Sequence, residues 1–268
     1  MKHKQHTRTL CAGIDAGSRA LKIVILNADT HAVTASAIED QALAPDAQAA
    51  RLFERMLSET GCTRVDVARI VATGYARNAI SIADATITEI TCHACGVHHV
   101  APQARTVIEI GGQDSKLLRL NDDGSVYDFA MNDRCAAGTG RFLEVVAQRL
   151  GIALSDLGPL ARHSVAPAAI SSMCIVFAET EIIGLLAAGV AACDIVAGVQ
   201  RSIAARVTAM IGRSVSEPVV FTGGVALVPG MAKALAETLG HPIHVSPQPQ
   251  FTGALGAALL AARQWHTA

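Results

Sequence analysis

The chain has 268 residues, enough for one large or two modest domains with their own hydrophobic cores. Hydrophobic residues make up 51% of it but aromatic residues only 3%, so alanine, valine, isoleucine and leucine must build those cores. A net charge of −1 argues against a broad nucleic-acid-binding surface.

The N-terminal stretch 1–8 is basic and histidine-rich, and it lacks the apolar segment of a signal peptide. No stretch reaches the roughly 18 uninterrupted apolar residues of a membrane span. The richest one, 182–199, is interrupted by three glycines and an aspartate and reads as a buried helix. We therefore expect a frayed tail, a cytoplasmic location, and neither a membrane nor a nucleic acid as partner.

Two parts of the chain follow the same pattern. Residues 10–26 read as an apolar strand, a polar turn with glycine, and a second apolar strand. Residues 106–120 repeat this order. Each segment is typical of a β-hairpin, and an internal near-duplication predicts two similar domains.

The remaining segments alternate between helical and strand patterns. The expected helices are 46–61, 77–83, 88–99, 138–150, 179–192, 195–211, 229–239 and 252–265. The expected further strands are 69–73, 218–222 and 241–245. This alternation predicts an α/β fold. We expect residues 1–104 with the returning C-terminal helix 250–268 to form domain I, and 105–249 to form domain II.

The first hairpin turn carries Asp15, Gly17, Ser18 and Lys22. A glycine turn between strands can direct backbone N–H groups at phosphate oxygens, because no Cβ blocks a close approach. Asp15, at the end of the first strand, suits coordination of Mg²⁺ through water. Taken alone, this short pattern fits an ordinary hairpin turn equally well.

The second hairpin turn, which contains Gly111, Gly112, Gln113 and Asp114, favours the phosphate interpretation. Two such turns can hold a polyphosphate from both sides. Gln113 is suited to orient an attacking water, and Asp114 to accept its proton or bind the metal through water.

Two further glycine turns end a strand or open a helix. Gly223 and Gly224 follow an apolar strand in the manner of an adenosine-binding loop. Gly138, Thr139 and Gly140 precede a helix whose N-terminus attracts anions. Neither the Walker nor the Rossmann glycine pattern is present, so a different type of nucleotide site is expected.

These turns resemble the motifs of the acetate kinase, hexokinase, heat-shock-protein-70 and actin ATPases. Asp15-Ala-Gly-Ser looks like their first phosphate motif, Gly111-Gly-Gln-Asp like the second, and Thr222-Gly-Gly-Val-Ala like the adenosine motif. The resemblance implies two ribonuclease-H-like domains, with mixed sheets flanked by helices, that close on ATP.

Of the seven cysteines, Cys135 and Cys174 each stand just before an expected helix. A helix N-terminus stabilises a thiolate, the form that binds iron. Two thiolates are half of what a four-iron cluster needs, and a two-fold dimer would supply the rest. Two buried, chemically inert cysteines are the alternative reading.

Together with the glycine turns, the cysteine segments resemble the activators of 2-hydroxyacyl-CoA dehydratases, a family that includes the ATPase subunits of benzoyl-CoA reductase. The resemblance runs from Ala12 to Ala262. The shared segments are Thr73-Gly-Tyr, Thr88-Glu-Ile-Thr, Gly111-Gly-Gln-Asp, Cys135-Ala-Ala-Gly-Thr-Gly and Cys174-Ile-Val-Phe-Ala-Glu.

The resemblance implies a homodimer that shares one [4Fe–4S] cluster held by Cys135 and Cys174 of each copy. Ferredoxin or flavodoxin would reduce the cluster. Binding and hydrolysis of ATP with Mg²⁺, giving ADP, would change the dimer's conformation. The electron would then pass at low potential to a partner dehydratase or reductase. The identity of the acceptor stays open.

The chain departs from the family pattern at three places. Ala76 replaces the usual glycine after Thr73-Gly-Tyr, and Glu109 stands where aspartate is commoner. Val228-Pro229 intervenes after the adenosine motif. These departures concern the nucleotide contacts and leave both cysteines in place.

Other candidate residues have simpler interpretations. Cys92 and Cys95 could form a zinc or redox pair, but no second cysteine pair accompanies them, and a structural or interface role is favoured. Glu179 and Glu181 point to different faces of a helix, and we assign neither a catalytic role.

Two other functions remain open at this point. A small-molecule kinase of the same fold would carry no cluster. A non-catalytic nucleotide sensor would not require Gln113 and Asp114 for its activity.

Overall fold

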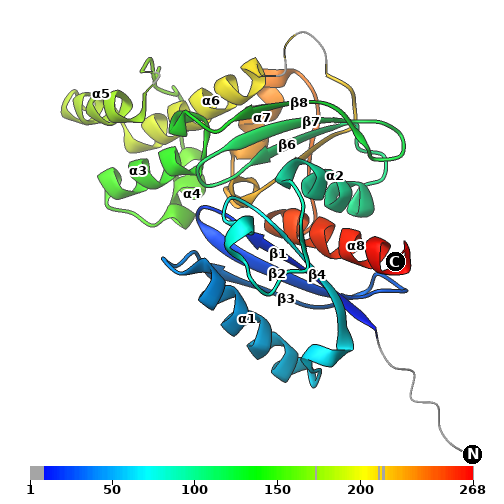
Figure 1. Ribbon diagram of the computed structural model, residues 1–268. Helices are drawn as coiled ribbons and strands as arrows, with labels where there is room; N and C mark the ends of the chain where they lie inside the picture. The colour runs from blue at the N-terminus through cyan, green and yellow to red at the C-terminus, as the bar shows by residue number, and fades with distance from the viewer. Residues whose placement is uncertain (1–8, 173, 211, 213–214, 268) are drawn as a thin grey trace, which may run out of the picture. The chain divides into compact units, whose positions relative to one another are not determined.

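The computed structural model describes residues 9–172, 174–210, 212 and 215–267, so the tail expected to fray lies outside the described residues. The chain forms two compact units: Met1–Val100 with Phe251–Ala268, and Ala101–Gln250. Each unit combines a sheet with flanking helices (Figure 1).

Unit 1 contains a five-stranded mixed sheet in the order β3-β2-β1-β4-β5. β1, β2 and β3 are antiparallel, and β4 and β5 continue the sheet in parallel with β1. The strands are β1 (Leu10–Ala16), β2 (Ala20–Asn27), β3 (Val33–Asp40), β4 (Val67–Thr73) and β5 (Ala85–Thr86). The helices are α1 (Pro45–Thr60), α2 (Glu89–Val100) and α8 (Thr252–Thr267), with short 3₁₀ turns at Arg64–Asp66 and Arg77–Ala79. A further 3₁₀ turn, Pro249–Phe251, spans the boundary between the two units and leads into α8.

Strand β1 is buried along its whole length because helices cover both faces of the sheet. Its even-numbered residues, such as Ile14, pack with Leu52 and Phe53 of α1. Cys11 points to the opposite face and packs with alanines and leucines of α8. The alternation of side chains along a strand thus explains how this strand serves two cores.

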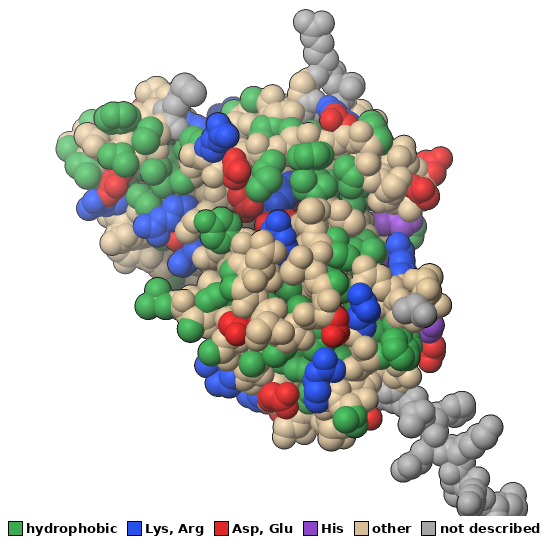
Figure 2. All heavy atoms as spheres, in the orientation of Figure 1, with side chains coloured by type: hydrophobic (Ala, Val, Ile, Leu, Met, Phe, Trp, Pro, Cys, Tyr) green, Lys and Arg blue, Asp and Glu red, His purple; other side chains and the backbone are tan. Residues whose placement is uncertain are grey.

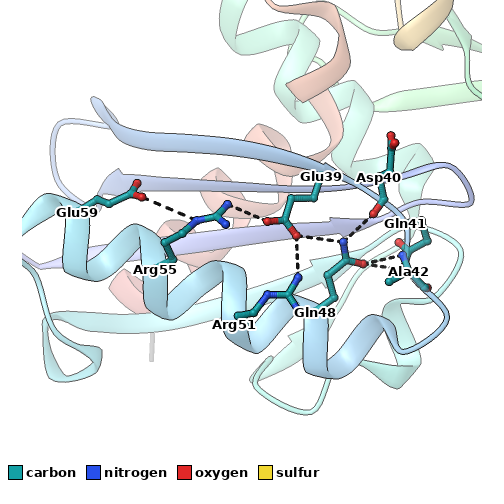
Figure 3. A network of polar contacts seen from close by, with 8 residues as sticks. All are labelled: Glu39, Asp40, Gln41, Ala42, Gln48, Arg51, Arg55 and Glu59. Atoms are coloured by element: carbon teal, nitrogen blue, oxygen red, sulfur yellow. Dashed lines mark hydrogen bonds and ion pairs between the residues drawn. The ribbon is translucent and has the colours of Figure 1, made fainter.

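Helix α1 is tied to the end of β3 by a polar network (Figure 3). Gln48 Nε2 donates to Glu39 Oε2 at 3.2 Å, and Arg51 and Arg55 contact the same carboxylate at 3.1 and 2.8 Å. The hydrogen bond from Gln48, followed by the two arginines, lowers the pKa of Glu39 against the opposing effect of burial. The network fixes the register between helix and sheet.

Unit 2 repeats the sheet of unit 1. Its order, β10-β9-β6-β7-β8, gives the same succession of antiparallel and parallel pairs when it is read from β8. The strands are β6 (Thr106–Ile110), β7 (Ser115–Leu120), β8 (Val126–Asn132), β9 (Val219–Thr222) and β10 (Ile243–Val245). The helices are α3 (Gly140–Leu150), α4 (Leu157–Ala161), α5 (Ile175–Ala187), α6 (Ala192–Ala209) and α7 (Met231–Leu239), with 3₁₀ turns at Ala136–Gly138, Leu154–Asp156 and Gly224–Leu227. The expected α/β fold with two similar sheets is confirmed.

Several local expectations were wrong. The stretch 182–199 is not one buried helix: α5 ends at Ala187, the chain turns through Gly189 at φ +80°, and α6 starts at Ala192. Of α5, only Ala178 and Ile182 are buried. The expected helix 77–83 is a single 3₁₀ turn. No described helix combines the length and apolar character needed to span a membrane.

Candidate functional site

The first hairpin turn joins an acidic and a basic side chain. Asp15 and Lys22 face each other across β1 and β2, with 3.0 Å between Asp15 Oδ2 and Lys22 Nζ. The Gly17 amide closes the turn by donating to Ala20 O at 3.1 Å. Asp15 is buried, whereas Gly17 and Ser18 are partly exposed. The four residues selected from the sequence are therefore brought to one end of the hairpin.

The structure adds residues around Asp15 that the sequence did not single out. His93 of α2 is buried, and its Nδ1 lies 2.9 Å from Thr252 Oγ1 of α8. A Cβ on Gly253 would lie 3.1 Å from Asp15 Oδ2 and 3.1 Å from His93 Nε2. Gly253 therefore leaves room for the side chains of Asp15 and His93, which a larger residue would crowd.

The second hairpin turn repeats the first at the level of single atoms. Glu109 pairs with Lys116 across β6 and β7, and their Oε2 and Nζ atoms are 3.0 Å apart. The Gly111 amide donates to Asp114 O at 3.0 Å, as Gly17 does in the first turn. Lys116 Nζ also lies 2.6 Å from Asp114 Oδ2. The turn thus places two carboxylates against one buried ammonium group.

The sequence analysis noted Glu109 only as a departure from the family pattern, and it missed the pairing of Glu109 with Lys116. The spacing in the sequence indicates this pairing: Asp15 and Lys22 are seven residues apart, and so are Glu109 and Lys116. Alignment of the two hairpins by this spacing makes Glu109 the counterpart of Asp15. Gln113, in contrast, is exposed at the tip of the turn, with a side chain accessible to solvent.

The start of α3 packs directly on this second turn. The amide of Gly140 donates to Gly111 O at 2.9 Å, and that of Arg141 donates to Gly112 O at 2.8 Å. Thr139 is the N-cap, and its hydroxyl accepts from the Arg141 amide at 3.3 Å. These amides already have protein acceptors, so residues 139–141 are joined to the second hairpin turn. Their own contact with an anion stays a prediction.

The third turn follows β9 and touches the second. Gly223 has φ +89°, and a Cβ at this position would lie 2.4 Å from Ile110 O and 2.6 Å from Glu109 Oε1. Gly224, the next residue, has nothing within 4 Å of its Cβ position. Only a glycine fits at 223, because the left-handed backbone and the crowding both exclude a side chain.

Cys135 and Cys174 are the two exposed cysteines of the seven, and each is the N-cap of a helical segment. Asn132 holds the Cys135 backbone from both sides: its Nδ2 donates to Cys135 O at 2.8 Å, and the Cys135 amide donates to Asn132 Oδ1 at 3.0 Å. The Cys174 carbonyl accepts from the Ala178 amide at 2.9 Å, which begins α5.

Glu181 of α5 binds the segment before Cys174. Its carboxylate accepts from the amide and hydroxyl of Ser171 at 2.9 and 2.7 Å, and from the Ser172 amide at 2.9 Å. Burial opposes ionisation, but these hydrogen bonds outweigh it and lower the pKa of Glu181 to about 2. Glu179 has another partner, Arg149 of α3. The two glutamates thus have separate structural roles.

Cys92 and Cys95 lie on α2 in apolar surroundings. Burial raises the pKa of Cys92 to about 12 and also raises that of Cys95. Burial likewise raises the pKa of Cys11 to about 11. These thiols are therefore protonated at neutral pH and poorly suited as thiolate ligands. In the described part of the chain, no group of three or more His, Cys, Asp or Glu side chains is arranged to hold a metal ion.

The sequence of residues 12–261 matches the model of the BadF/BadG/BcrA/BcrD ATPase family. The chain belongs to this ATPase family. It is 43% identical over 93% of its length to the 2-hydroxyisocaproyl-CoA dehydratase activator of Clostridioides difficile, of which it covers 93%. It is 44% identical, also over 93% of its length, to the (R)-2-hydroxyglutaryl-CoA dehydratase activating ATPase of Acidaminococcus fermentans, of which it covers 95%.

Solved structures agree with this family assignment. The activator of the 2-hydroxyisocaproyl-CoA dehydratase from Clostridium difficile, with bound ADPNP, has a TM-score of 0.91 and 42% identity, with coverage of 97% of this chain and 96% of that one. The ROK hexokinase from Thermus thermophilus, at 14% identity and a TM-score of 0.54, shares the fold. The sequence-based resemblance to dehydratase activators is confirmed.

The cysteines of this ATPase fit the donor set of an iron–sulfur cluster. Cluster iron binds thiolates, and of the two exposed cysteines Cys135 stands at the start of the 3₁₀ turn Ala136–Gly138 and Cys174 at the start of α5. They would supply two of the four donors that a [4Fe–4S] cluster needs.

Proposed function

We propose that this protein is an ATP-hydrolysing electron carrier that activates a 2-hydroxyacyl-CoA dehydratase or a related reductase. The support is its similarity to activators of such dehydratases, together with one structural observation. Cys135 and Cys174 are exposed at helix starts within the unit that also carries the second phosphate turn. A redox site and a nucleotide-binding turn in one compact unit can respond to each other.

The nucleotide chemistry is assigned to the two hairpin turns. Asp15, Ser18 and Lys22 would contact the phosphates and Mg²⁺ from the first turn, with Asp15 acting through water. In the second turn, Gln113 would orient the attacking water. Lys116 donates a hydrogen bond to Asp114 Oδ2, so we assign Asp114 Oδ1 as the atom that accepts the proton of that water.

The adenosine would be bounded by Gly223 and Gly224. Gly223 brings the backbone of this loop against Ile110 and Glu109, at the end of the strand that leads into the second turn. Gly111 and Gly112 would contact the phosphates, and Gly17 would do so in the first hairpin. Residues 138–140 would respond to the phosphates through the hydrogen bond that Gly140 donates to this second turn.

Cys135 and Cys174 would hold a [4Fe–4S] cluster together with the same two residues of a second copy. When bound, the cluster supplies a one-electron carrier of low potential. The chain's own contribution is to hold the thiolates at two fixed helix starts. Ferredoxin or flavodoxin would deliver the electron, and the dehydratase or reductase would accept it.

The exposed apolar surface of α5 supports a dimer interface with a second copy of the chain at this helix. Val176, Phe177 and Ile183 of this helix are 62%, 69% and 48% exposed. Figure 2 shows apolar side chains gathered over the helix that Figure 1 labels α5. A helix with an uncovered apolar face beside an accessible thiol is suited to a two-fold interface.

Anaerobic iron analysis tests the proposal. We expect about four irons per dimer, and Cys135→Ser or Cys174→Ser should abolish this content. Cys193→Ser, at a partly buried cysteine of α6, is the matched control and should keep it. Retention of full iron by either of the first two variants would refute the shared cluster.

A further inference from the structure

Arg206 of α6 binds the backbone just before Cys174. Its Nη2 donates to Ser172 O at 2.6 Å, and its Nη1 donates to Ser202 O at 2.9 Å and to the Ser202 hydroxyl. The side chain is half-buried. A guanidinium group with bonds on both of its arms has one orientation, so Ser172 is fixed relative to α6.

The same arginine lies against the turn that follows Cys135. A Cβ on Gly138 would be 3.7 Å from Arg206 Cβ and 3.2 Å from Asn132 Nδ2. Asn132 is the residue whose amide holds the Cys135 backbone. Arg206 therefore binds the Cys174 segment through its guanidinium group, while its Cβ stands beside the Gly138 turn that follows Cys135.

The turn at Gly138 continues into the start of α3, which is hydrogen-bonded to the second phosphate turn. Gly140 and Arg141 donate to the carbonyls of Gly111 and Gly112. A continuous set of contacts thus runs from the phosphate turn through the Gly138 turn and Arg206 to Ser172. Such continuous contacts can couple the second hairpin turn to the segment before Cys174, and an exchange experiment can measure this coupling.

We propose that Arg206 is a positioning residue that ties the Cys174 segment to the Cys135 turn, so that nucleotide at the second phosphate turn moves both segments together. Without Arg206, the Cys174 segment keeps its bonds to Glu181 of α5 and the bond from the Ala168 amide to Asp194 O of α6, but Ser172 loses its own link to α6. The inference rests on the proposed function for the binding of nucleotide at Gly111 and Gly112, and it does not require the cluster.

Hydrogen–deuterium exchange on iron-free protein tests this role. Peptides covering 132–140 and 168–176 are compared without nucleotide, with Mg²⁺ and ADP, and with Mg²⁺ and ADPNP. In the wild type, nucleotide should change exchange in both peptides. In Arg206→Ala, the change should persist at 132–140 and disappear at 168–176. Baseline exchange at 168–176 should rise about tenfold, as expected for loss of a hydrogen bond from a charged donor.

Two further variants complete the test. Arg206→Lys keeps a cation without the rigid fork and should retain part of the response at 168–176. Arg201→Ala, at an exposed arginine of the same helix, should behave as the wild type. If Arg206→Ala does not fold, Arg206→Lys replaces it in the test. Its change in exchange on nucleotide binding should then be reduced at 168–176 and complete at 132–140.

Other results would overturn the proposal. These are a full response at 168–176 in Arg206→Ala, a wild-type protein without response in that peptide, or loss of the response or of nucleotide binding from the whole of unit 2 in the variant. The iron content of the wild type is measured separately. Absence of iron would refute the proposed electron carrier. The exchange experiment on Arg206 would still be interpretable, because it uses iron-free protein.

Discussion

Lys116 forms a buried ion pair with Glu109 across β6 and β7, with 3.0 Å between Nζ and Oε2. The lysine side chain is 2% exposed and that of its partner 5%. Asp114 Oδ2 lies 2.6 Å from the same ammonium group. Removal of an ion from water is costly unless a counter-charge compensates it, so neither carboxylate tolerates loss of the lysine easily.

Lys116→Met keeps the volume of the side chain and removes its charge. We expect a loss of about 3–5 kcal/mol in the free energy of unfolding, because a buried carboxylate is left without its partner. Urea denaturation measures it. Lys233→Met, at an exposed lysine of α7, should leave the urea midpoint unchanged. The double variant Lys116→Met/Glu109→Gln should recover part of the loss, and no recovery would show that the charge is not the cause.

The hairpins and their turns were predictable because they are encoded locally. Alternating apolar residues define the strands, and glycine with polar neighbours defines each turn. The edge strands β3 and β8 were missed, since half of their residues face solvent and their pattern is weak. Lys116 was missed although its spacing from Glu109 repeats that of Lys22 from Asp15.

The surroundings of the cysteines were less predictable. Apart from Glu179, Thr180 and Glu181, the composition of α5 is apolar, and apolar composition does not say which face another element covers. The contact of Arg206 with Ser172 joins residues 34 positions apart, and no local pattern announces it. Sequence could select Cys135 and Cys174, whereas their exposure and the residues that hold their segments required the fold.

Adjacent glycines of the third turn should respond differently to one added methyl group. Gly223→Ala should destabilise the protein by more than about 2 kcal/mol, because its Cβ would collide with Ile110 O and its φ of +89° disfavours a side chain. Gly224→Ala should keep the wild-type melting temperature, since its Cβ position is open.

Binding of ADPNP to Gly224→Ala then tests the adenosine contact. If the nucleotide lies against this loop, the methyl group should weaken binding in a protein of unchanged stability. Calorimetric titration measures the affinity. An unchanged affinity would remove Gly224 from the proposed site, and a normal melting temperature for Gly223→Ala would contradict the crowding at Gly223.

Glu181 gives the stability a pH dependence with a defined sign. Its pKa is lowered from 4.5 to about 2 in the folded protein. The stabilisation by this carboxylate is therefore complete above pH 4.5 and is lost as the pH falls toward 2. Because the group is partly solvated, we expect Glu181→Gln to cost about 1 kcal/mol at pH 7.

The difference between wild type and Glu181→Gln should shrink as the pH is lowered from about 4.5 toward 2. Thermal unfolding at a series of pH values follows it. Glu237→Gln, at an exposed residue of α7, should match the wild type throughout. A Glu181→Gln difference that stayed constant down to pH 2.5 would show that the ionised carboxylate is not the group that binds Ser171 and Ser172.

Phe177 tests the interface proposed at α5. It is 69% exposed in the single chain, although it lies in the first turn after Cys174. Phe177→Asp should convert the proposed dimer to a monomer, because an interface that covers this helix would bury the new charge. Light scattering coupled to gel filtration measures the mass. Tyr75→Asp, at an 82% exposed tyrosine of unit 1, is the control and should remain dimeric.

Asp114 separates ATP turnover from cluster binding. Asp114→Asn preserves the shape of the side chain but cannot accept the proton of the attacking water, and we expect turnover to fall about a hundredfold or more. The iron content should stay at the wild-type level, because Cys135 and Cys174 are unchanged. Asp122→Asn, in the exposed turn after β7, should retain full turnover.

The pairing of Asp114 with Lys116 makes the stability of the variant part of the same experiment. In Asp114→Asn, the amide oxygen of the new side chain would still accept a hydrogen bond from Lys116, and Glu109 would still balance the lysine's charge. The urea midpoint should therefore change little. A large loss of turnover in a stable, nucleotide-binding variant would then reflect chemistry. Wild-type turnover by Asp114→Asn would remove this carboxylate from the mechanism and leave Gln113 as the residue of the turn that positions the water.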